Sequence, residues 1–353
     1  MRAFVAAVVM GLLTGCGSVA LHPPAATSQP SSIAGESPSP SATPSPTLSQ
    51  SPTTSPSLAG QALSCRLPVI WAAKDGFKGG FLSFPDQVLT VDPTASLFYD
   101  RAFAKWLPAA RSQVSPDGRR YAYAGEKPPS YAGGKLHVVD VATGVDTVVY
   151  SGGTTYSVVD FAAAGIYVTS YPAPFGATTG LWLQNPSGGE PKLISSEIFD
   201  PAVGGGAAWG LHLNAADPSP GPGGVEGPLN EVLRFDLRTG ASTPWFYRPG
   251  ARVWILGFDA AGHPFVRVYT EANVTEPVEL WLVQSQSQAM RLFAGGGSTP
   301  AQLGAVDSHG VWFDSFRFSP NTVWLYAGGS LQKVATIDVI GVIDVFVAGG
   351  CIP

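Results

Sequence analysis

Two His–Asp pairs in predicted turns are the side chains of this sequence best suited to acid–base or ligand chemistry. His263 follows Asp259 by four residues, and His309 follows Asp307 by two. An imidazole beside a carboxylate can act as a general base or hold a ligand. Aspartate and histidine also form ordinary turns, so a structural role stays open beside the functional one. We name these four residues as candidates for a ligand-binding face.

No catalytic or cofactor motif accompanies these pairs. The sequence contains no HExxH, no GxSxG, no phosphate-binding loop and no Cys/His spacing of a metal site. A further histidine, His137, lies in a predicted strand, where we expect a side chain satisfied by its neighbours. We therefore expect no catalytic residue, no metal and no cofactor, and the sequence favours a non-catalytic binding protein over an enzyme.

The first sixteen residues have the features of a bacterial export signal. Arg2 precedes an apolar run over residues 3–13, which is too short to span a bilayer as a helix. The run ends in Leu13-Thr14-Gly15-Cys16, which resembles the lipobox of bacterial lipoproteins. This resemblance implies a signal peptide over residues 1–15, cleavage after Gly15 and lipid attachment to the Cys16 thiol. A secretory signal with a chance cysteine is the alternative.

A polar tether follows Cys16. Pro, Ser and Thr make up 25 of the 37 residues over 23–59, where Glu36 is the only charged side chain. Such a segment cannot bury enough apolar surface to offset the entropy lost on ordering. We expect a disordered linker over residues 16–62 that holds the following domain away from the membrane, on the extracellular face or in the periplasm.

Short strands separated by turns dominate residues 63–353. Segments rich in Val, Tyr, Phe and Trp alternate with Gly, Pro, Asp and Ser, and no long window has a helical period. The predicted strands include residues 120–124, 136–141, 147–150, 166–170, 181–184, 191–194, 232–237, 264–269, 280–283 and 311–314. The sequence therefore predicts one all-β domain. Its net charge of −5 gives no basic surface for nucleic acid.

The turns recur at a regular spacing. Gly118, Gly165, Gly262 and Gly310 open similar strand patterns and are separated by 47, 97 and 48 residues. The longer separation equals two units, with Gly206 in a degenerate turn between them. Units of 40–50 residues with four strands are typical of propeller blades. Residues 63–353 are long enough for about six, so we predict a six-bladed β-propeller of four-stranded antiparallel blades.

Two motifs in one unit carry a family resemblance. The first is Ser115-Pro116-Asp117-Gly118 and the second is DVATG at residues 140–144. Together they resemble the WD40-like blade of TolB-type six-bladed propellers, in which such motifs form the turns between successive strands. The resemblance covers this unit well, residues 225–246 in part, and the other units by period alone. It implies a fold and says little about activity. A β-sandwich pair and a seven-bladed ring stay open.

The two remaining cysteines stand at the ends of the domain. Cys65 and Cys351 would meet if the first and last strands share a blade, and outside the cytoplasm such a pair usually forms a disulfide. We expect residues 67–71 to lie beside residues 343–348. Two free buried thiols are the alternative. Trp182 and Trp281 occur at equivalent places in their units, which favours packing between blades.

These observations lead to one functional hypothesis and one alternative. We expect a monomeric, membrane-anchored extracytoplasmic lipoprotein whose propeller binds an envelope protein, peptide or glycan without catalysis. The insert over residues 215–227 breaks the repeat and should project from a rim, where grafted loops often carry function. The alternative is an extracytoplasmic hydrolase or lyase with its site at the channel mouth. A channel mouth lined by converging Asp, Glu and His side chains with shifted pKa values would favour that alternative.

Overall fold

The computed structural model describes residues 63–73, 76–130, 132–171, 179–214, 229–270, 278–295, 299–315, 321–338 and 342–353, with residue 343 as backbone only. All of them belong to one unit of the chain, Pro46–Pro353. The predicted signal peptide, Cys16, the linker and the insert over 215–227 lie outside these residues. Across the described ranges, no helix is long and apolar enough to cross a membrane.

Strands form nearly all the regular structure of the described ranges. These ranges contain no α-helix and one short 3-10 helix, η2 (Arg111–Gln113). Every pairing between strands is antiparallel. The β-branched and aromatic residues that suggested strands are the ones that line the buried faces. The all-β prediction is confirmed.

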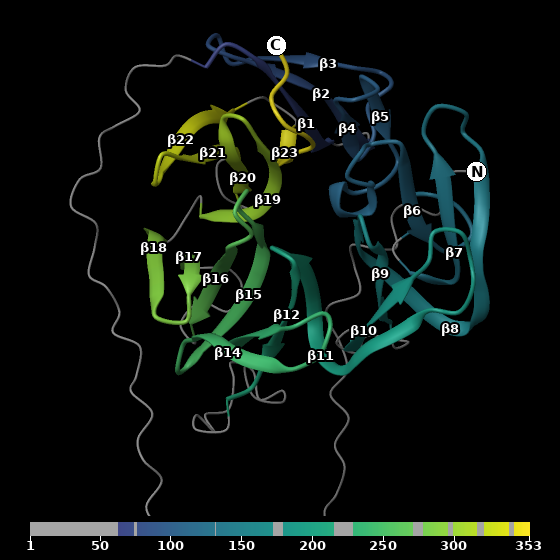
Figure 1. Ribbon diagram of the computed structural model, residues 1–353. Coiled ribbons are helices and arrows are strands. Elements are labelled where there is room, and N and C mark those ends of the chain that lie inside the picture. The colour runs from purple at the N-terminus through teal and green to yellow at the C-terminus, as the bar shows by residue number, and fades with distance from the viewer. Residues whose placement is uncertain are drawn as a thin grey trace, which may run out of the picture. The chain divides into compact units, whose positions relative to one another are not determined.

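Three sheets contain four strands each. The first has the order β23-β1-β2-β3, with β23 (Val342–Val347), β1 (Arg66–Ala73), β2 (Gly76–Ser83) and β3 (Val88–Val91). The second contains β15 (Ala251–Phe258), β16 (Pro264–Thr270), β17 (Glu279–Ser285) and β18 (Gln288–Ala294). The third contains β19 (Pro300–Asp307), β20 (Gly310–Ser315), β21 (Asn321–Ala327) and β22 (Ser330–Ile337). Figure 1 shows these sheets following one another in chain order.

A nine-stranded sheet covers the middle of the chain. Its strands are β6 (Arg120–Ala124), β7 (Gly133–Asp140), β8 (Asp146–Ala162), β9 (Gly165–Ser170), β10 (Thr179–Gln184), β11 (Lys192–Gly204), β12 (Ala207–His212), β13 (Glu231–Phe235) and β14 (Ser242–Tyr247). The first half of β8 pairs with β7 and its second half with β9, and β11 divides in the same way between β10 and β12. β8 therefore links a three-stranded group, formed by β6, β7 and its own first half, to a four-stranded group, and β11 links two four-stranded groups.

The continuity of β8 and β11 differs from the sequence prediction. We expected strands to end near Tyr150 and Ile194, but both continue into the next group. Gly152 and Gly153 lie inside β8 without the left-handed φ that would make a turn there. Extended glycines allow a strand to change partners without ending. The two glycines after Tyr150 therefore suggested a turn that the structure does not have.

The recurring glycines form turns before strands as predicted, but the turns at 165, 206, 262 and 310 lie between the first and second strands of a group and do not open it. All four glycines have positive φ: Gly118 and Gly262 lie just before β6 and β16, and Gly165 and Gly310 are the first residues of β9 and β20. The degenerate turn is present too, at Gly205 and Gly206 before β12. At Gly165 a Cβ atom would also lie 2.7 Å from Gln184 O, so glycine is required there for space as well as for conformation.

A core lies between each pair of neighbouring strand groups. Trp281 of β17 is buried with Trp209 and Val253 between β11–β14 and β15–β18. Trp182 of β10 packs at the edge of the cluster shared by β6–β8 and β8–β10. Both tryptophans lie on the third strand of their groups and pair in register with Val168 and Val266 respectively. The predicted packing role of these two side chains is consistent with this placement.

A short hairpin joins the first sheet to the nine-stranded sheet. It consists of β4 (Phe98–Asp100) and β5 (Lys105–Leu107). Tyr99 and Trp106 pack against Phe81 of β2, with ring centroids 5.2 and 5.8 Å away. Leu107 is buried with Tyr121 in a cluster on β6 and β7. The hairpin therefore fills the space between two groups and brings Asp100 toward the turn before β6.

The two ends of the described chain share one sheet. β23 pairs with β1 through Val69↔Val347 and Trp71↔Val345, and Figure 1 shows yellow β23 beside dark blue β1. Cys65 and Cys351 form a disulfide with a Cα–Cα distance of 5.7 Å. The predicted pairing of residues 67–71 with residues 343–348 and the predicted disulfide are both present in the structure.

Candidate functional site

The Ser115–Gly118 motif forms a tight turn before β6. The Ser115 hydroxyl accepts a hydrogen bond from Arg120 N–H at 3.0 Å and lies 2.7 Å from Asp117 Oδ1. Gly118 N–H donates to Ser115 O at 2.8 Å. The bonds from the Ser115 side chain and the Arg119 N–H lower the pKa of Asp117. The motif is thus a self-contained turn, as the sequence predicts.

This turn also lines a cavity of about 470 Å³. The remaining walls come from the β4–β5 hairpin, η2, the end of β8 near Asp160, the end of β19 at Val306 and Gly350 after β23. These segments are far apart in the sequence and belong to different strand groups. The cavity therefore exists only when the groups are assembled, which makes it the strongest candidate for a binding site among the described residues.

Asp100 is the most buried charged group of the cavity wall. The residue is 4% exposed, and its Oδ1 accepts a hydrogen bond from Ala102 N–H at 2.8 Å. Its Oδ2 is buried and has no hydrogen-bond partner within the described ranges. Burial raises the pKa of Asp100, although the N–H groups of Ala102 and Phe103 act in the opposite direction. A Cβ atom at position 118 would lie 2.8 Å from this Oδ2, so Gly118 is needed for space next to Asp100.

Asp160 contributes a second perturbed carboxyl. Burial raises its pKa to about 6, although Arg111 and the Phe161 N–H oppose the shift. The residue follows a register shift between Val158 and Asp160 in the pairing of β8 with β9. Such a bulge changes the direction of a side chain and is frequent near binding sites. The strand irregularity therefore explains how an apolar strand presents a carboxyl at the cavity.

The cavity combines acidic groups with exposed arginines. Asp100 and Asp160 are the less exposed carboxyls, whereas Asp117, Arg101 and Arg111 are exposed. The described residues that line the cavity include no histidine or cysteine. Among the described residues, no group of three or more His, Cys, Asp or Glu side chains could hold a metal ion. The arrangement is suited to hydrogen bonding and charge pairing with a small polar group.

The predicted His–Asp pairs stand apart from this cavity. Asp259 accepts hydrogen bonds from Ala261 N–H, His263 N–H and the His263 ring, which is 2.9 Å away at Nδ1. Asp307 accepts bonds from His309 N–H at 2.7 Å and from the Trp312 indole at 2.9 Å. Each aspartate thus organises its own turn. Neither His263 nor His309 is among the residues that line the cavity.

His309 instead lines a second, larger cavity of about 780 Å³. Leu63, Phe84 and Leu325 contribute apolar walls, and the cavity lies beside the first described residues of the domain. The described wall residues include no acidic side chain. We therefore treat the first cavity, with its perturbed carboxyls, as the candidate site.

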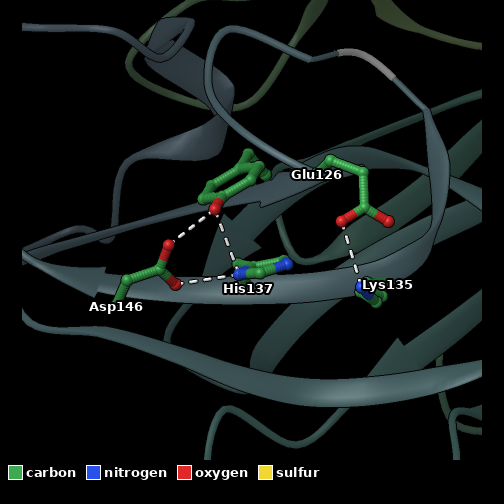
Figure 2. A network of polar contacts seen from close by, with 5 residues as sticks. Glu126, Lys135, His137 and Asp146 are labelled. Atoms are coloured by element: carbon green, nitrogen blue, oxygen red, sulfur yellow. Dashed lines mark hydrogen bonds and ion pairs between the residues drawn. The ribbon is translucent and has the colours of Figure 1, made fainter.

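A third polar cluster lies within the sheet of β6, β7 and β8. His137 Nδ1 lies 2.9 Å from Asp146 Oδ1, and the two side chains point toward one another in Figure 2. The same nitrogen lies 3.0 Å from the Tyr123 hydroxyl. Tyr123 donates to Asp146 Oδ2 at 2.6 Å, and its ring stacks on His137 at 4.5 Å. Burial is the main cause of the raised pKa of Tyr123. Figure 2 also shows an exposed ion pair of Lys135 with Glu126 at 3.0 Å.

This cluster supports a structural role for His137. Its Nδ1 is engaged by neighbours, as expected, while its Nε2 is buried without a partner among the described residues. Tyr123 and His137 are direct cross-strand partners, so the cluster follows from strand register. None of its members lines the candidate cavity.

Sequence reasoning missed Asp100 and Asp160. Asp160 stood as a lone charge in the apolar segment of residues 158–161, and that anomaly was a usable signal. Asp100 gave no such signal, because its burial depends on the hairpin contact with the turn at Gly118.

Comparisons with known proteins add only distant similarities. No family model matches the sequence, and no curated protein matches it. A protein from Lactobacillus plantarum is similar in structure, with a TM-score of 0.45, 13% identity, and coverage of 80% of this chain and 99% of that chain. TolB from Acinetobacter baumannii has a TM-score of 0.46 and 10% identity, with coverage of 81% and 67%. A prolyl endopeptidase has a TM-score of 0.47 and 13% identity, with coverage of 77% and 43%. These similarities are too weak to indicate an activity.

Proposed function

We propose that this chain is an exported lipoprotein whose β-domain binds an envelope ligand without catalysis, at the cavity that contains Asp100 and Asp160. The observation that carries the proposal is the buried Asp100 Oδ2, which lacks a hydrogen-bond partner in the wall of an assembled cavity. A protein keeps such a group at a cost in stability, and binding sites are where that cost is usually found. The ligand class is a protein, peptide or glycan of the cell envelope.

The proposal includes a closed ring of six blades. The first blade would be β23-β1-β2-β3, and the second would run from η2 to the first half of β8. The third would run from the second half of β8 to the first half of β11, and the fourth from the second half of β11 to β14. The fifth and sixth would be β15–β18 and β19–β22. Contacts of β15 with β19, of β18 with β22, and of β20 with β23 support this succession. The β4–β5 hairpin supports closure between the first and second groups. The cavity would then lie where turns of several blades meet.

Export and anchoring are supported by two separate features. The disulfide between Cys65 and Cys351 belongs to proteins of oxidising compartments. The residues before Cys16 resemble a lipoprotein signal, and two or three acyl chains on that cysteine would hold the protein stably at a membrane. The linker over residues 16–62 would then separate the binding domain from the bilayer.

A hydrolase or lyase at the same cavity is the second candidate function. Asp160 favours it, because a carboxyl with a pKa of about 6 can accept a proton near neutral pH. The binding function is better supported because the lining supplies no histidine or cysteine partner, and Ser115 is committed to its own turn.

Blocking the cavity tests the proposal. Ala163 is exposed in the turn after β8 and lines the cavity, so Ala163→Trp would fill it without disturbing a core. The matched control is Ala142→Trp, which places the same side chain in the exposed turn after β7. The mature chain should retain soluble envelope peptides or glycans, and only Ala163→Trp should abolish retention. Equal retention by both variants would contradict the cavity as the binding site.

A further inference from the structure

We infer that the cavity takes the alkylammonium group of its ligand, such as a lysine side chain, a peptide amino terminus or another primary amine. This inference rests on the proposed function, because it assigns the chemistry of the same site. It adds to that function that the part of the ligand bound in the cavity is positively charged.

The two less exposed carboxyls have no cationic partner among the residues that the structure describes. Neither Asp100 nor Asp160 forms an ion pair with a described lysine, arginine or histidine within the 4.0 Å limit for such pairs. Asp100 keeps one oxygen without any hydrogen-bond donor. Arg111 acts on Asp160 through its charge only, without direct pairing. An ammonium group would supply the missing donors and the missing charge together.

The arginines do not make the cavity an anion site. Arg101 and Arg111 are exposed, so water already solvates their guanidinium groups. Asp100 is buried, and Asp160 is largely shielded from solvent. A ligand gains more from neutralising a poorly solvated charge than from replacing water around a solvated one. The preference is therefore for a positive group at the carboxyls.

The remaining walls suit an alkyl chain. Val114, Phe161 and Val306 provide apolar surface in the same cavity. Methylene groups of a lysine side chain or an aliphatic amine can pack on such surface while the ammonium reaches the carboxyls. A metal ion would need more ligands, and no cluster of three suitable side chains occurs among the described residues.

Three probes of equal length test the charge preference. Pentane-1,5-diammonium, glutarate and pentane-1,5-diol share a five-carbon skeleton and differ in their end groups. Calorimetry of the full mature chain at pH 7.5 should show saturable binding of the diammonium probe by about 10 mM, a range suited to weak ligands. Glutarate and the diol should bind at least tenfold more weakly. Equal or tighter binding of either one, or no saturation by the diammonium probe, would overturn the inference.

Two variants locate the effect. Asp160→Asn should weaken diammonium binding at least tenfold, whereas Glu197→Gln removes one exposed carboxylate away from the cavity and should leave binding unchanged. Asp100→Asn is the second variant, because its amide oxygen can still accept the Ala102 N–H bond and preserve the hairpin. It should also weaken binding at least tenfold. Unchanged affinity in both folded variants would overturn the assignment.

The outcomes separate this inference from the proposed function. Envelope material could still bind and be displaced by Ala163→Trp while the diammonium probe fails. The ammonium assignment would then be wrong and the binding site would stand. If Ala163→Trp displaces neither envelope material nor the probe, the cavity itself is the wrong site.

Discussion

Asp307 Oδ2 accepts a hydrogen bond from Cys351 N–H at 2.7 Å. This bond joins the turn between β19 and β20 to the C-terminal segment that carries the disulfide. Asp314 Oδ2 and Asn321 Oδ1 accept bonds from Val347 and Val345 of β23 in the same way, at 3.1 and 3.2 Å. The last strand is therefore held on one side by β1 and on the other by side chains of the neighbouring sheet, which protects its free edge.

Replacing Asp307 should weaken this junction. Asp307→Ala removes the acceptor for Cys351 N–H, Trp312 Nε1–H and His309 N–H, which leaves buried donors unsatisfied. We expect a loss of about 2–4 kcal/mol in the free energy of unfolding, measured by urea titration. Asp86→Ala is the control, because Asp86 is exposed in the loop after β2. Equal stability of the two variants would show that Asp307 does not hold the chain ends.

The disulfide should contribute strongly to stability. It closes a loop of 286 residues between Cys65 and Cys351. The Cys65→Ser/Cys351→Ser double variant should lose about 2–5 kcal/mol of unfolding free energy in denaturant titration. Peptide mapping of the unreduced wild type should recover the two cysteine peptides as one linked species. Modification of both thiols by iodoacetamide in the unreduced native protein would contradict the bond.

Strand content and turn positions could be predicted because their signals are local. The glycines at 118, 165, 262 and 310 each require a backbone conformation that is decided within a few residues. The turn at the DVATG motif could be predicted for the same reason. Asp140 Oδ1 accepts hydrogen bonds from Thr143 only three residues away, and the same pattern recurs between Asp236 and Thr239. Cysteine placement predicted which strands meet at the ends.

The candidate site could not be predicted because it is not local. Asp100 and Asp160 are 60 positions apart and act on one cavity through the β4–β5 hairpin and the end of β8. The hairpin lies in residues 63–110, where the one Asp-Gly step, at residues 75–76, leads into β2 and does not mark the hairpin. His263 and His309 were predicted as ligand candidates, but each forms a turn with its neighbouring aspartate. A sequence pattern within one turn cannot distinguish this structural role from ligand binding.

Asp160 should make stability depend on pH in a defined direction. Its pKa in the folded chain is about 6, above the ordinary value of 3.8, so the folded state holds this proton more tightly than the unfolded state. Its contribution to stability is therefore full below about pH 4 and is lost as the pH rises through 6. Asp160→Asn should be more stable than wild type by about 1–2 kcal/mol at pH 8, after allowance for partial exposure.

The difference should vanish near pH 4, where the wild-type carboxyl is protonated in both states. Urea titrations of wild type and Asp160→Asn between pH 4 and 8 measure it directly. A constant difference across this range would show that Asp160 is not held in a desolvating environment.

Cys16 should determine membrane attachment. If it is the lipid site, wild-type cells fed labelled palmitate should incorporate label into this chain, and Cys16→Ser should abolish incorporation. The variant should stay uncleaved or leave the membrane fraction. Cys65→Ser is the control for loss of a cysteine elsewhere and should keep the label. Normal maturation and membrane retention of Cys16→Ser would contradict lipid anchoring.

Hydrogen–deuterium exchange with bound envelope fragments most directly tests where this protein binds. The mature chain would be compared alone and with soluble envelope peptides or glycans at saturating concentration. We predict protection at residues 98–102, 115–118 and 160–163, which line one cavity from three separate parts of the chain. Protection confined to the turns at His263 and His309, or none in these three segments despite binding, would contradict this prediction.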